Sequence, residues 1–114
     1  PPKLTWEVEK RSDLKPHQVM IRLKVDRSLE IPAFAARCDR PCTTTMGGAN
    51  LMTGGFKAFQ GNNRPDVTGF TFTLPRPLGA GHDVYWNIES NDASPLAILE
   101  VEIVPPESLP PEMR

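Results

Sequence analysis

Residues 19–26 read Val-Met-Ile-Arg-Leu-Lys-Val-Asp, with a branched apolar side chain at every odd position and Arg, Lys and Asp at three of the even ones. The same period of two recurs in residues 4–9, 83–89 and 99–103. In an extended strand, successive side chains point to opposite faces, so a period of two indicates strands with one buried face. These stretches predict an antiparallel β protein.

Composition supports one small domain made of short elements. The chain has 114 residues, enough to bury a core without help from a metal or a disulfide. Hydrophobic residues make up 39% and charged residues 24%, which is typical of a globular protein and argues against wholesale disorder. The 13 prolines and 8 glycines interrupt any long helix and suit many strands joined by turns. We therefore expect an all-β fold.

The expected architecture is an antiparallel two-sheet sandwich of about seven short strands, because short strands at regular spacing are typical of sandwiches and barrels. We expect residues 1–3 to be a linker, residues 4–104 the β-sandwich domain, and residues 105–114 a proline-rich tail in an extended, polyproline-like conformation. The predicted strands lie near residues 4–10, 17–25, 30–38, 55–60, 67–74, 83–90 and 96–104.

One short run resembles a known class of domain. Residues 78–85 read Leu-Gly-Ala-Gly-His-Asp-Val-Tyr, which resembles the leucine, glycine and tyrosine run that enters the sixth strand of immunoglobulin and fibronectin type III domains. The leucine-to-tyrosine spacing is one residue longer than the fibronectin pattern. The inter-sheet cysteine pair of antibody domains is absent, since Cys38 and Cys42 are only four positions apart. The resemblance implies an immunoglobulin-like architecture and carries no functional residues.

Charge and hydropathy exclude several classes of function. The formal net charge is −1 and basic residues form no stripe, so a nucleic-acid partner is not expected. No apolar run approaches the ~20 residues that cross a bilayer, so we expect no membrane insertion in this segment. The chain begins with proline, and we expect it to be a domain of a larger protein, with an upstream membrane anchor as one arrangement. Its composition fits a soluble bacterial domain, and the compartment stays open.

Catalytic and metal-binding patterns are missing from the sequence. It has no Gly-x-Ser-x-Gly, His-Glu-x-x-His or dinucleotide-binding glycine motif, so we expect a non-enzyme without cofactor or metal. His17 and His82 are isolated, which leaves the two cysteines without further zinc ligands. Cys38 and Cys42 either close a disulfide over a turn or remain a pair of thiols, and their spacing alone leaves both readings open.

A glycine-rich segment, residues 43–55, is the first candidate for binding another protein or a second copy of the chain. Unpatterned loops of this length are often functional, two Gly-Gly pairs allow hinging, and methionine offers an adaptable apolar contact. An equal alternative is a crossover that covers the core. An open sheet edge is the other candidate surface, and Pro32 places the third strand there. The candidate partner-binding residues are Met46, Gly47, Gly48, Asn50, Leu51, Met52, Gly54 and Gly55.

Tyr85 marks an alternative site. It shares a predicted polar face with Asp83 and Asn87, and an aromatic ring beside carboxylate and amide groups can hold a sugar. The commoner use of such a tyrosine is to fix a nearby loop. The sequence therefore favours a protein-interaction module of adaptor, sensor or accessory type, with a carbohydrate-binding module or a structural spacer as alternatives.

Overall fold

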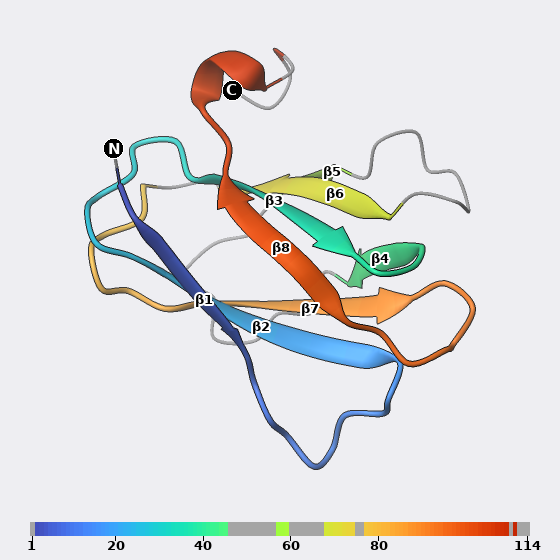
Figure 1. The fold of residues 1–114 in the computed structure, drawn as a ribbon. Coiled ribbons are helices and arrows are strands. Elements are labelled where there is room, and N and C mark those ends of the chain that lie inside the picture. The colour runs from blue at the N-terminus through green and yellow to red at the C-terminus, as the bar shows by residue number, and fades with distance from the viewer. Residues whose placement is uncertain (1, 46–56, 60–67, 75–76, 110, 112–114) are drawn as a thin grey trace.

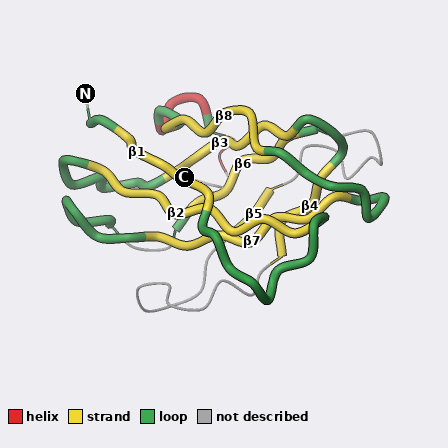
Figure 2. Tube along the Cα trace, turned by 60° about the horizontal axis from the view of Figure 1, so that its bottom comes forward, coloured by secondary structure: helices red, strands yellow, loops and turns green. Residues whose placement is uncertain are grey.

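The computed structural model describes residues 2–45, 57–59, 68–74, 77–109 and 111, and these residues form an all-β fold (Figure 1). Two antiparallel sheets stack in layers (Figure 2), as the sequence predicted and as a β-sandwich requires. Sheet 1 has the order β1-β2-β7-β4 and sheet 2 the order β5-β6-β3-β8. The strands are β1 (Leu4–Val8), β2 (Gln18–Val25), β3 (Ala33–Cys38), β4 (Cys42–Thr45), β5 (Lys57–Phe59), β6 (Gly69–Thr73), β7 (Val84–Ser90) and β8 (Ile98–Ile103).

The strand order of this fold differs from that of immunoglobulin domains. Immunoglobulin constant-type domains pair strands A, B, E and D in one sheet and C, F and G in the other, so the last strand pairs with the one before it. Here the last strand, β8, pairs with β3, and β7 lies in the opposite sheet. The shared feature is therefore the pair of packed antiparallel sheets.

The core lies between the sheets and is formed by the predicted alternating positions. Ile21 and Leu23 of β2 and Trp86 of β7 are fully buried in sheet 1. Phe72 of β6 stacks on Trp86 with ring centroids 4.0 Å apart, which joins the two layers at their centre. Phe34 packs beside Phe72 at 5.5 Å. Such aromatic contacts add to the stabilisation that comes from burying large apolar surfaces.

The third strand is central, so the prediction of an open edge at Pro32 is wrong. β3 pairs with β6 on one side and with β8 on the other. Pro32 precedes the first residue of the strand, where its missing N–H removes no ladder hydrogen bond, and its carbonyl accepts the Leu74 N–H at 3.0 Å. The outer strands of the described sheets are β1, β4, β5 and β8.

Two further differences concern strands that the sequence pattern did not resolve. Residues 43–45 were expected to begin a loop, but they belong to β4, where Thr43 and Thr45 pair with Glu89 and Asn87. Threonine is β-branched and favours strands even without apolar alternation. In β8, the register shifts beside Cys38, so Ile98 packs on the core and Leu99 is 51% exposed. The period of two in residues 99–103 predicted that Leu99 points into the core, and this irregularity leaves its side chain exposed instead.

The proline-rich tail folds back on the sandwich. Instead of an extended chain, residues 106–108 form a single 3-10 turn, η2 (Pro106–Ser108). The following Leu109 is only 3% exposed and packs with Val104 against Ala33, which lies on the outer face of β3. One apolar side chain thus anchors a segment that its proline content alone would describe as a linker.

Gly69 marks a close approach between neighbouring strands. A Cβ placed on it would lie 2.8 Å from the Ala36 carbonyl oxygen of β3. A side chain at that distance would force the two strands to shift, so this close pairing of β6 and β3 favours glycine here.

Candidate functional site

The structure does not describe residues 46–55 of the segment first predicted to bind a partner. All eight candidate partner-binding residues lie in this range. Only the first residues of the segment are placed, in β4. The loop hypothesis therefore stays a prediction, and the site below is built from the described strands.

The alternative trio does share one face. Asp83 precedes β7, and Tyr85 and Asn87 lie within it, at positions that alternate with the buried Val84 and Trp86. All three are half-buried on the outer face of sheet 1. The sequence thus correctly grouped these residues, because the strand period decides which face each one occupies.

The register of β2 against β7 adds cations that the sequence did not place there. Arg22 pairs opposite Tyr85 and contacts Glu7, Glu9 (Nε–Oε1 3.1 Å) and Asp83 (Nη1–Oδ2 3.9 Å). The Lys24 ammonium lies 3.4 Å from the other Asp83 oxygen. The Asp83 carboxylate therefore lies between two cations, and its Oδ1 atom is buried without a hydrogen-bond partner among the described residues.

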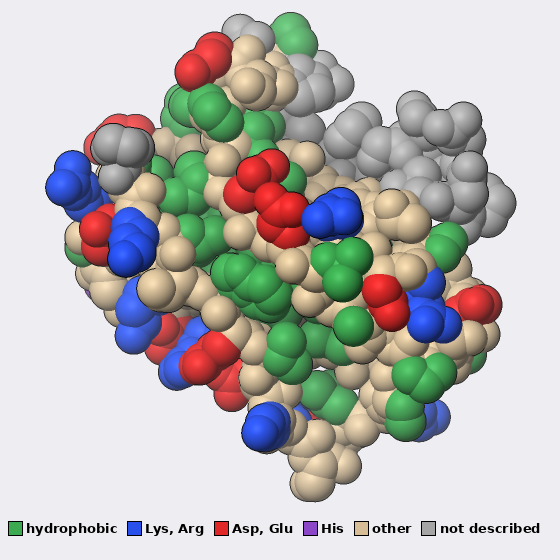
Figure 3. Space-filling model, viewed as in Figure 1, with side chains coloured by type: hydrophobic (Ala, Val, Ile, Leu, Met, Phe, Trp, Pro, Cys, Tyr) green, Lys and Arg blue, Asp and Glu red, His purple; other side chains and the backbone are tan. Residues whose placement is uncertain are grey.

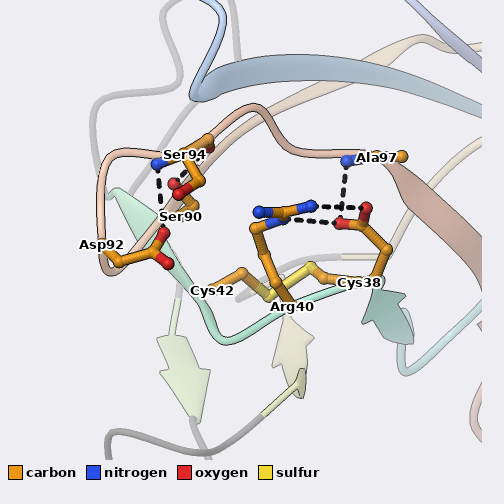
Figure 4. Close-up of polar contacts among 8 residues, drawn as sticks. Cys38, Arg40, Cys42, Ser90, Asp92, Ser94 and Ala97 are labelled. Atoms are coloured by element: carbon orange, nitrogen blue, oxygen red, sulfur yellow. Dashed lines mark hydrogen bonds and ion pairs between the residues drawn. A yellow bond between two sulfur atoms is a disulfide. The ribbon is translucent and has the colours of Figure 1, made fainter.

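A disulfide joins the sheets at one end of the sandwich (Figure 4). Cys38 ends β3 in sheet 2 and Cys42 begins β4 in sheet 1, with Cα atoms 6.4 Å apart. Both cysteines are buried, at 2% and 1% exposure. The structure thus favours the disulfide over the pair of thiols, and the bond closes the crossover between the layers.

The crossover from β7 to β8 lies beside this disulfide. The Asn91 N–H donates to the Pro41 carbonyl at 3.0 Å, and the Asp39 carboxylate accepts the Ala97 N–H at 3.1 Å. Hydrogen bonds from the Arg40 guanidinium and from the Ala97 N–H lower the pKa of the Asp39 carboxyl below its ordinary value. These polar contacts fix the corner as a structural unit, and they leave Asp39 and Arg40 engaged with each other.

The remaining surface of interest is the side of the molecule on which β1 and β8 approach each other from different sheets (Figures 1 and 2). We call it the β1–β8 flank. Figure 3 looks onto this flank and shows hydrophobic side chains gathered between the two strands. Its residues are Leu4, Trp6 and Val8 of β1 and Ile98, Leu99, Glu100, Val101, Glu102 and Ile103 of β8.

The flank combines exposed apolar side chains with backbone groups that no other described strand pairs with. Val8 is 46% exposed and Leu99 51%, and both are among the few large hydrophobic residues in the described chain with such exposure. Trp6 and Ile103 are half-buried and pack against the core. Exposed apolar surface that adjoins a core costs free energy in water and is a common mark of a binding surface.

Hydrogen-bond register identifies the free backbone groups. The Val104 N–H donates to the Ala33 carbonyl at 2.9 Å. In an antiparallel ladder the backbone groups point alternately to one neighbour and the other, so the N–H and C=O groups of residues 100, 102 and 104 point toward β3. The N–H and C=O groups of Val101 and Ile103 therefore point toward the flank. By the same alternation, the Glu9 N–H bond to Met20 (2.8 Å) leaves the backbone of Leu4, Trp6 and Val8 facing outward on β1. Within the described strands, nothing pairs with either edge.

Comparisons with known proteins add no identity: no family model, curated protein or solved structure matches the chain. Among the described residues, no three His, Cys, Asp or Glu side chains converge as metal ligands. In the same part of the chain, no helix has the length and apolar character needed to cross a membrane. The surface of the described strands is therefore the basis on which a function is proposed below.

Proposed function

We propose that this domain is a non-catalytic protein-interaction module that takes up an extended segment of a partner along the β1–β8 flank. The observation that carries the proposal is the coincidence of two strand edges that no described strand pairs with and the exposed side chains of Val8 and Leu99. Strand addition uses both features, because main-chain hydrogen bonds supply affinity and alternate side chains supply specificity. The domain would serve as an adaptor or accessory unit, with the packed sheets as a rigid support.

The flank suits this role better than the other edges that the structure describes. β4 is the fourth strand of sheet 1 and continues into the segment that begins at Met46, while the side chains of β5 are not described. β8 has six residues and β1 five, which is long enough for several ladder hydrogen bonds. A partner strand there would also cover apolar surface on both sheets at once.

A capture experiment with matched variants tests the proposal. The intact domain, a Val8→Ser/Leu99→Ser variant and an Ile31→Ser control are immobilised and exposed to lysate from the source organism. Ile31 is 39% exposed on the connection between β2 and β3, so it controls for the loss of an exposed apolar side chain elsewhere. We expect a partner that the control retains and the flank variant loses.

Other results would point to the alternatives. Capture that is lost only when residues 47–55 are replaced by a short turn would move the site to the loop. Capture of glycans that Tyr85→Ala abolishes would favour the carbohydrate-binding alternative. No specific capture by the intact domain would contradict an interaction module and favour a structural spacer.

A further inference from the structure

The outer face of sheet 2 indicates what kind of strand the flank would accept. Beside the β8 edge, a hollow of about 360 Å³ lies over β3 and β6. The small residues Ala35, Gly69 and Thr71 line it together with Arg37 of β3, and Glu100 and Glu102 of β8 stand at its border. The hollow therefore lies within reach of a long side chain on a strand added next to β8.

The charges at this border are unbalanced. Arg37 of β3 binds Glu100 across the strands at 3.0 Å. Glu102 pairs opposite Ala35, which offers no charge, and no ion pair joins Glu102 to any described residue. A strand added on the free side of β8 would place its outward side chains next to Glu102 and Glu100. Basic side chains there would form cross-strand ion pairs, while acidic ones would be repelled.

The same charges argue against a second copy of this chain as the occupant. Two β8 strands paired edge to edge would set Glu100 and Glu102 against the same residues of the other copy. A β1 strand would present Thr5 and Glu7, of which the second is also acidic. Like charges on directly opposed positions destabilise strand pairing, so the outward-facing glutamates protect this edge from self-association.

Resting on the proposed function, we infer that the β8 edge binds an antiparallel strand in which apolar and basic residues alternate. Its apolar side chains would lie over the flank beside Val101 and Ile103. Its lysine or arginine side chains would lie on the outer face beside Glu102 and extend over the hollow above Ala35. The period of two in the partner thus matches the two faces of the β8 edge.

Backbone register makes the inference more specific. Val101 and Ile103 face the edge with both their N–H and C=O groups, and in an antiparallel ladder their hydrogen-bonded partners carry side chains on the same face. The apolar residues of the partner would therefore donate and accept the hydrogen bonds to β8. The N–H groups of its basic residues would point away from the domain.

Synthetic peptides test each part of this inference on the intact chain. The probes are fluorescein-labelled seven-residue peptides that alternate valine with lysine, serine or glutamate, and binding is read by fluorescence anisotropy. We expect the lysine peptide to bind at least about fivefold more tightly than the serine peptide, and the glutamate peptide least tightly. N-methylation of the valines should abolish binding of the lysine peptide, while N-methylation of the lysines should leave it intact.

Charge reversal in the domain gives the complementary test. Glu102→Lys should lower the affinity for the lysine peptide about fivefold and raise that for the glutamate peptide, whereas Glu30→Lys, on an exposed residue of the β2–β3 connection, should change neither. Equal binding of the lysine and serine peptides, or no effect of Glu102→Lys, would overturn the inference. If the inference failed in this way but Leu99→Ser abolished binding of the serine peptide, the flank would remain a strand-binding site, and only the preference for a basic partner would be refuted. If no peptide bound and the flank variant captured the same proteins as the intact domain, both would fail.

Discussion

Breaking the Cys38–Cys42 disulfide should destabilise the domain by about 2 kcal/mol. The bond closes a loop of only a few residues, since its cysteines are four positions apart. The chain-entropy relation gives about 2 kcal/mol for so short a loop. For a chain of 114 residues, this loss corresponds to a decrease in melting temperature of about 8 °C. The effect is modest because a short loop restricts the unfolded chain much less than a long one does.

Urea unfolding with and without reductant measures this difference. Both sulfur atoms are buried, so a reductant reaches them when the domain opens, and each sample needs time to equilibrate. Intact-mass analysis after alkylation confirms that two thiols have been released. A Cys38→Ala/Cys42→Ala variant should lose somewhat more stability, because it also removes buried volume from the core. Equal unfolding midpoints for the oxidised protein and for the reduced protein kept in reductant would refute the reasoning.

Three further substitutions probe the fold. Gly69→Ala should destabilise the domain by about 1–3 kcal/mol in chemical denaturation, because its Cβ would meet the Ala36 carbonyl oxygen at 2.8 Å; wild-type stability would contradict the close approach. Leu109→Ala should cost about 2 kcal/mol, measured in the same way, since that side chain anchors the tail; an unchanged midpoint would mean that the tail contributes nothing. Asp39 has a lowered pKa in the folded state, so its carboxylate stabilises the fold above the unfolded pKa of about 4, and this contribution is lost as the pH falls through the folded value. Asp39→Asn should therefore be less stable than wild type near neutral pH, and urea midpoints should converge on acidification; a constant difference across this range would show that the charge is not responsible.

The sequence was sufficient to predict the fold class because the alternation is local. Ile21, Leu23 and Trp86 are buried where the period of two placed them. The same rule put Tyr85 on an outer face with Asp83 and Asn87. Each of these predictions needs only the geometry of one strand, so no knowledge of its neighbours is required.

What the sequence did not predict depends on contacts between distant segments. The central position of β3 follows from its pairing with β6 and β8, and nothing in its own residues specifies those partners. The cations around Asp83 come from the register of β2 against β7. The β1–β8 flank likewise arises from the way two sheets stack, and the exposure of Leu99 arises from a local shift in register. The disulfide stayed undecided because four-residue spacing permits it without requiring it.

The pairing of β3 with β8 has a consequence for how the chain reaches its native state. Phe34 of β3 lies opposite Ile103 of β8. The central strand β3 therefore pairs with a strand that is separated from it in sequence by more than half of the chain. Bringing such distant segments together costs conformational entropy before their contacts stabilise the fold. Folds dominated by distant pairings therefore form slowly. During synthesis, sheet 2 cannot be completed until β8 has left the ribosome. We therefore expect the domain to fold only once β8 has been synthesised, over milliseconds to seconds, and shortened chains that end before β8 to remain unfolded.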